Sequence, residues 1–149
     1  MFERLKQGLR ARFTGADGLQ DEHAGAIAAA MLLLEVAWAD QQISAEELER
    51  VRAALIQIFD VSADDASTLA SQARAAHAAS ISMYPFTKVA NESLSADAKK
   101  ALLVNCWRLA SVDAVVDEHE EHTIRRIADL LYLSHDDFIA AKLEARRAR

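Results

Sequence analysis

Hydrophobic residues recur every three or four positions along most of the chain, the spacing that places them on one face of a helix. This pattern predicts helices near 1–13, 21–40, 44–59, 62–80, 95–110, 117–131 and 134–147, with a helical or irregular connector over 81–94. Between Ala26 and Ala39 the chain is apolar on nearly every side of the predicted helix, so this helix should be the buried centre. With only 4 Gly and 1 Pro, we predict an all-α protein, a compact bundle of about seven helices.

The first predicted helix differs from the others because basic residues flank its apolar face. That face consists of Phe2, Leu5, Leu9 and Phe13. The run TGADG at residues 14–18 interrupts the helical pattern. We therefore predict an amphipathic helix over residues 1–16 and a helical domain over residues 17–149. Such a helix can lie on an anionic membrane surface, on its own domain or on a second copy of the chain, which leaves a homodimer open.

Two short acidic stretches, ADQQISAEE and VDAVVDEHE, resemble each other, and each follows an apolar helical pattern. The matching pairs are Asp40 with Asp113, Ser44 with Asp117, and Glu47 with Glu120. Further along, Val61 and Ser62 match Leu133 and Ser134. We predict two pseudo-repeated helical hairpins, over about residues 21–60 and 96–132, which should superpose.

Each acidic stretch has a structural explanation. A Ser or Asp just before a helix accepts a hydrogen bond from the N–H of the third helical residue, and a Glu at that third position bonds back to the cap. Ser44 with Glu47 fits this capping box, and Asp117 with Glu120 fits it again. On this interpretation the acids begin helices and need no ligand.

The alternative interpretation is a binding site. Asp40 and Asp113 stand where helices are predicted to end, and the helix dipole disfavours a negative charge there. A neighbouring Lys or Arg, or a bound metal, would offset this cost. Oxygen ligands alone favour a hard ion such as Mg²⁺, Ca²⁺ or Mn²⁺. The candidate metal ligands are Asp40, Glu47, Asp113, Asp117 and Glu120.

Charge and motif content narrow the classes of function. The formal net charge of -6 argues against nucleic acid as a partner. A single cysteine excludes an intramolecular disulfide and a cysteine-based zinc site. The N-terminus lacks a signal-peptide pattern and no apolar run could span a bilayer, so we expect a cytoplasmic protein with no transmembrane segment. Nucleophile triads, P-loops and dinucleotide fingerprints are missing from the sequence, and we predict no enzyme activity.

Glu35 interrupts the apolar central helix, and a carboxylate in such surroundings needs a partner. We expect a tyrosine, tryptophan or arginine of the second half to supply it, with Arg108, the repeat counterpart of Glu35, as the candidate. A catalytic or metal-binding role for Glu35 is the alternative. We also expect the core to contain Trp38, Trp107 and Cys106. A solvent-exposed helix face should carry His119 and His122.

Three stretches carry a resemblance to a known family. They are LLLEVAWADQQISAEE, YPFTKVAN and DEHEEHTIRRIADLLYLSHDDFIAAKLEAR. Over about residues 26–149 the chain resembles the short stand-alone TerB-like tellurite-resistance proteins of bacteria. The resemblance implies a compact all-helical fold, a link to stress-response operons, membrane-associated partners and a metal-related role for the acidic residues. It brings no enzyme activity.

The chain departs from the family pattern at the residue after each loop aspartate, where Gln41 and Ala114 replace a glycine. This departure favours a binding surface for a protein partner over a metal site. We therefore expect a non-enzymatic interaction module of bacterial stress response that uses its acidic loops and needs no cofactor. A divalent-metal sensor or buffer is the alternative function.

Overall fold

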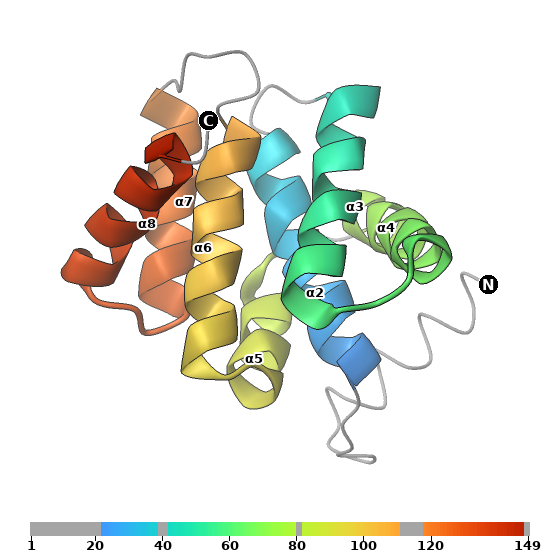
Figure 1. Cartoon of the computed structure of the whole chain (residues 1–149), viewed down its shortest axis with the longest axis horizontal. Helices are drawn as coiled ribbons and strands as arrows, with labels where there is room; N and C mark the ends of the chain where they lie inside the picture. Colours follow the sequence, from blue (N-terminus) through green and yellow to red (C-terminus); the bar gives the residue numbers. More distant parts are fainter. Residues whose placement is uncertain (1–21, 39–41, 80–81, 111–117, 148–149) are drawn as a thin grey trace.

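The computed structural model describes residues 22–38, 42–79, 82–110 and 118–147 (Figure 1). Within these ranges it contains seven helices and no strand, which confirms the predicted all-α class. The helices are α2 (Glu22–Ala37), α3 (Ala45–Phe59), α4 (Ala63–Ala78), α5 (Tyr84–Ser93), α6 (Ala96–Ala110), α7 (Glu118–Leu130) and α8 (His135–Arg147). The amphipathic helix predicted for residues 1–16 lies outside the described residues.

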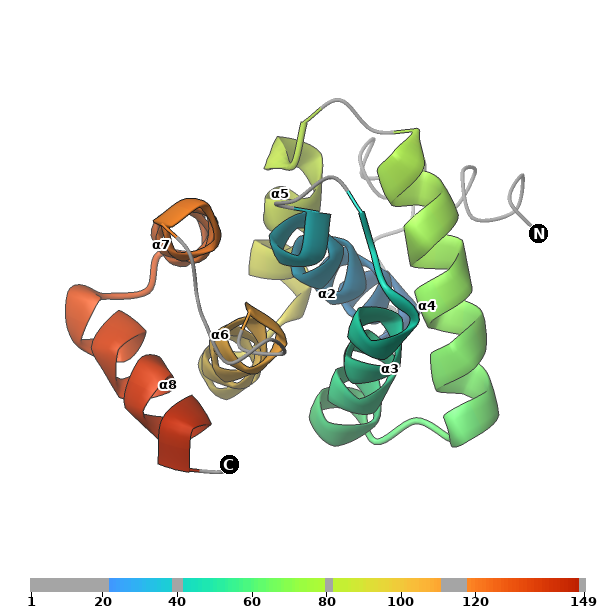
Figure 2. The ribbon, with the colours of Figure 1, turned by 90° about the horizontal axis from the view of Figure 1, so that it is seen from above.

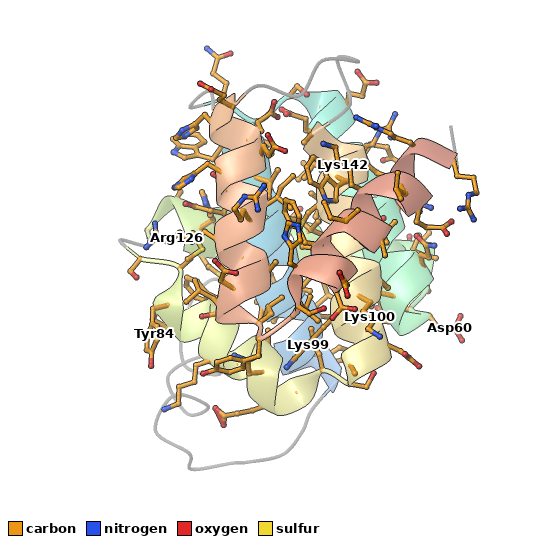
Figure 3. The ribbon with its side chains drawn as sticks, turned by 90° about the vertical axis from the view of Figure 1, so that its left-hand side faces the viewer. Asp60, Tyr84, Lys99, Lys100, Arg126 and Lys142 are labelled. Carbon is orange, nitrogen blue, oxygen red and sulfur yellow. The ribbon has the colours of Figure 1, made fainter. Side chains whose placement is uncertain are left out.

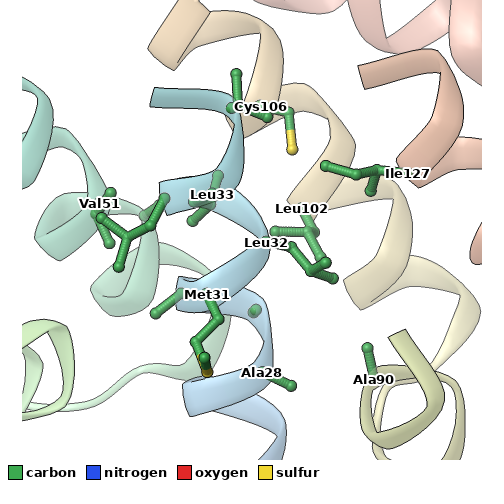
Figure 4. Packing of buried hydrophobic residues seen from close by; sticks show 14 of the residues in the cluster. Ala28, Met31, Leu32, Leu33, Val51, Ala90, Leu102, Cys106 and Ile127 are labelled. Carbon is green, nitrogen blue, oxygen red and sulfur yellow. The ribbon is translucent and has the colours of Figure 1, made fainter. Parts of the chain in front are cut away.

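Helix α2 forms the centre of the molecule, as its uniformly apolar sequence predicts. Every residue from Ala24 to Leu34 is buried. Helices α3, α4, α5, α6 and α7 all pack against it. In Figure 4, Val51 of α3 lies on one side of α2, while Leu102 of α6 and Ile127 of α7 lie on the other. Among the described helices, however, none is long and apolar enough to cross a membrane.

Small residues allow the neighbouring helices to approach α2 closely. Ala28, Ala29 and Ala30 are fully buried and occupy little space. At Gly25 a Cβ atom would lie only 3.2 Å from the side chain of Leu94, so the end of α5 contacts the α2 backbone directly. The Ala-rich first half of α2 therefore combines high helix propensity with close packing.

The remaining helices flank the centre on two sides. Helix α4 packs against α2 and α3, whereas α8 packs against α6 on the far side of the molecule (Figure 2). Trp107 of α6 and Phe138 of α8 meet edge to face, with ring centroids 5.3 Å apart. Arg125 lies 4.4 Å from the Phe138 ring and Lys142 lies 5.1 Å from the Trp107 ring. These cations cover the aromatic contact that fixes α8 on the bundle.

The corners between α3 and α4 and between α7 and α8 have the same construction, as the predicted repeat requires. Asp60 and Tyr132 are the described non-glycine residues with positive φ, 55° and 60°, and each lies two residues before a serine. Ser62 Oγ accepts from the N–H of Asp65, and Ser134 Oγ accepts from the N–H of Asp137. The two copies therefore agree at the level of backbone conformation and helix cap.

Helices α5 and α6 hold the end of α7 through side-chain donors. Asn91 Nδ2 donates to the Leu130 carbonyl over 2.9 Å. Lys99, which is labelled in Figure 3, donates from Nζ to the Leu131 carbonyl over 3.3 Å. Leu130 is the last residue of α7 and Leu131 follows it, a place where backbone carbonyls lack intrahelical partners. The corner between α7 and α8 is thus held by side chains of α5 and α6.

Replacing Tyr132 by Gly should stabilise the protein by about 0.5–1 kcal/mol. The left-handed backbone conformation costs a residue with a side chain roughly 1–2 kcal/mol, and Gly avoids this cost. The greater backbone entropy of Gly in the unfolded chain offsets about 0.5–1 kcal/mol of that gain. The Tyr132 side chain is 83% exposed, and Lys99 Nζ lies 6.0 Å from the centroid of its ring. At this distance and exposure the cation contributes little, so removal of the ring costs little stability. Urea denaturation measures the change.

Asp60→Gly is the matched control, because Asp tolerates the left-handed conformation better than Tyr. Its gain should therefore be smaller. A loss of stability in Tyr132→Gly would show that the exposed ring makes a stabilising contact.

Candidate functional site

Both predicted acidic loops connect helices whose ends meet at one end of the bundle. The C-terminal ends of α2 and α6 and the N-terminal ends of α3 and α7 lie together at the top of Figure 1. The first turns of α3 and α7 contribute the acidic side chains Glu46, Glu47, Glu118, Glu120 and Glu121. We call this set the acidic end. Three predicted ligands, Asp40, Asp113 and Asp117, lie outside the described residues.

Glu47 forms the predicted capping box with Ser44. The Glu47 N–H donates to Ser44 Oγ over 3.0 Å, and the Ser44 N–H donates to Glu47 Oε1 over 2.9 Å. One carboxylate oxygen of this candidate ligand therefore serves the start of α3. In the ranges that the structure describes, no group of three or more His, Cys, Asp or Glu side chains is arranged to hold a metal ion.

The other carboxylates of the acidic end differ in their surroundings. Glu46 and Glu118 are exposed, whereas Glu120 is partly buried at the start of α7. Glu121 lies 3.6 Å from Lys142 of α8. His119 and His122 are exposed beside these acids, as predicted. Because the helix dipole stabilises carboxylates in a first turn, the acidic end can keep its charge without a bound cation.

Glu35 finds a partner in α4, not in the second half of the chain. Glu35 Oε1 lies 2.8 Å from His77 Nε2, and the two side chains are 35% and 12% exposed. The expected pairing with Arg108 is therefore wrong, since Arg108 donates to Gln57 of α3. The helical period already places His77 on the buried face of α4, one and two turns beyond Ala73 and Ala70.

The hydrogen bond with His77 lowers the pKa of Glu35 below its usual value of 4.5, against the opposing effect of burial. The charges of His77, and of Arg126 and His119 on α7, lower it further. Glu35 is consequently ionised at neutral pH although it is partly enclosed.

Trp38 lies beside this pair, in a position the sequence predicted wrongly. Trp107 is buried, as expected, but Trp38 is 44% exposed. Its ring meets the His77 ring edge to face, with centroids 6.0 Å apart. Trp38 follows the last residue of α2, where the surrounding helices no longer cover the chain.

A cleft of about 450 Å³ opens next to Glu35, between the ends of α2 and α4 and the start of α5. Its apolar lining consists of Met31, Ile43, Met83 and Phe86, and its polar lining includes Glu35, His77 and Arg74. A partly enclosed carboxylate, an imidazole and an exposed indole thus share one apolar hollow. The sequence pointed to Glu35 but gave no indication that a cleft would form around it.

Cys106 has no role in this site. Its side chain is fully buried in α6, as predicted, and burial raises the pKa of its thiol to about 12. A thiol in this state is not a nucleophile at neutral pH.

One comparison with known proteins identifies a family. The model of the family described as "Tellurite resistance protein TerB" matches residues 26–143, from the first half of α2 into α8. No curated protein and no solved structure matches the chain at a significant level.

Glu35→Gln should lower the melting temperature most near neutral pH. The pKa of Glu35 is lower in the folded state than its usual value of 4.5, so the ionised carboxylate stabilises the folded protein. This stabilisation is complete above pH 4.5 and is lost as the pH falls through the folded-state pKa. Thermal melts of wild type and variant across this range measure the difference. It should shrink as the solution is acidified.

Glu49→Gln is the matched control, because Glu49 pairs with Arg52 on the exposed face of α3. Such surface pairs contribute little, so its effect should be small at every pH. A difference between Glu35→Gln and wild type that is independent of pH would contradict a stabilising role for the ionised Glu35 carboxylate.

Proposed function

Since the chain belongs to the TerB family of tellurite resistance proteins, we propose that it is a non-enzymatic interaction module of the bacterial stress response, acting in the cytoplasm. Its binding surface is the acidic end. The observation that carries this proposal is the placement of the first turns of α3 and α7, with their five glutamates, at the same end of the bundle.

The partner that fits this surface is a protein segment rich in Lys or Arg. Exposed Glu46 and Glu118 can meet such cations without breaking a helix cap. Charges at the rim of an interface raise the association rate and suppress partners of like charge. A net charge of -6 likewise disfavours nucleic acid as the ligand.

A photo-crosslinking amino acid placed at Glu46 or Glu118 in the native host should capture a protein partner. Glu92 and Asp129 are matched control positions, because they are exposed and belong to the last turns of α5 and α7, which end toward the opposite end of the bundle (Figure 1). Probes there should give no specific adduct. When the crosslinking residue is at position 118, the additional change Glu46→Lys should lower the yield of the adduct, because it removes the charge attraction to the partner. Equal adducts from all four positions, or none from the acidic end, would refute the proposed surface.

Divalent ions test the alternative function of a metal sensor or buffer. Binding to the native state alone adds about 2.7 kcal/mol at a hundredfold excess over Kd. If the acidic end binds a protein, then millimolar Mg²⁺, Ca²⁺ or Mn²⁺ should raise the melting temperature no more than NaCl of equal ionic strength. A large, ion-selective rise that disappears when Asp40→Asn is combined with Asp113→Asn would establish the metal-binding alternative instead.

A further inference from the structure

We propose that the cleft beside Glu35 binds a small organic amine, with the ammonium group against the Glu35 carboxylate and an apolar body against Met31, Met83 and Phe86. This site is formed by α2, α4 and α5 and does not include the glutamates of the acidic end. Helix α2 lies between α4 and α5 (Figure 2), and its second half contributes Met31 and Glu35 to the lining of the cleft.

The size and lining of the cleft fit a small molecule. Its volume of about 450 Å³ lies within the roughly 300–1,000 Å³ of small-molecule sites, and its lining combines polar and apolar surface in nearly equal parts. Met83 and Ile43 are only partly buried against the core, so they present apolar surface to the cleft. The flexible thioethers of Met31 and Met83 can adapt to ligands of different shape.

Glu35 supplies the charge that selects an amine. His77 engages Oε1, and within the described residues the other carboxylate oxygen of Glu35 accepts no hydrogen bond. An ammonium group would form a charge-assisted hydrogen bond with this oxygen in a partly desolvated position. A carboxylate or phosphate ligand would instead place a second negative charge beside an ionised acid.

Two neighbouring residues modify this selectivity. The indole of Trp38 is exposed beside His77, and such a ring attracts a cation placed over its face. Arg74 lines the cleft one turn before His77 on α4 and is exposed. Its guanidinium opposes a cationic ligand, and screening by solvent and salt reduces this repulsion without abolishing it. Removing that charge should therefore strengthen amine binding.

The test compares three probes of similar shape, 2-phenylethylamine, 2-phenylethanol and phenylacetate, with the full chain at neutral pH. Isothermal titration gives the affinity, and NMR of the methionine methyl groups gives the location. The amine should bind roughly tenfold or more tightly than the alcohol, phenylacetate should bind most weakly, and the methyl signals of Met31 and Met83 should shift.

Two variants separate the proposed contact from general hydrophobic binding. Glu35→Gln should reduce the affinity for the amine to that of the alcohol. Arg74→Gln, an exposed change that leaves the core intact, should increase the affinity for the amine and leave that for the alcohol unchanged. It keeps the test decisive if Glu35→Gln folds poorly. Equal binding of the three probes, no saturable binding of the amine up to about 10 mM, or no effect of Arg74→Gln would overturn the proposal.

Discussion

Helix α2 has no side that faces water along residues 24–34, and the other helices must be arranged to cover it. A helix that is apolar all round cannot rest against a single neighbour, because the remaining surface would stay in contact with water. Helices α3 to α7 therefore surround it, and α8 is attached to the outside through α6. Val36 and Ala37 are still buried, but Glu35 is partly exposed and Trp38 is exposed, and both line a cleft at this end of α2.

The gathering of five glutamates at one end of the molecule also follows from the arrangement of the helices. Helices α3 and α7 begin at the end where α2 and α6 finish (Figure 1). Glutamates are favourable in the first turn of a helix, so both starts bring negative charge to the same place. The resulting surface is acidic without a strained or unpaired arrangement of carboxylates. Binding of a protein partner with complementary charge requires no further structural feature, whereas a metal site would require several carboxylates to converge on one ion.

The sequence predicted the features that depend on neighbouring residues in the chain. Hydrophobic spacing located the helices, the all-apolar run located α2, and short polar residues located the caps at Ser44, Ser62 and Ser134. It failed where the outcome depends on how distant helices cross. Glu35 pairs with His77, 42 positions away on α4, and repeat symmetry wrongly suggested Arg108. Trp38 lies outside the core because coverage of α2 ends before it, which the hydrophobic pattern alone does not reveal.

Hydrogen exchange along α2 tests the central claim, that burial of this helix on every side holds the fold together. If the claim is correct, then the amides from Ala28 to Leu34 exchange only through global unfolding, and their exchange free energy equals the free energy of unfolding from denaturant titration. Amides of α8, which packs mainly on α6, should exchange through smaller openings. Exchange of the α2 amides through local openings, with α8 more strongly protected, would contradict the account.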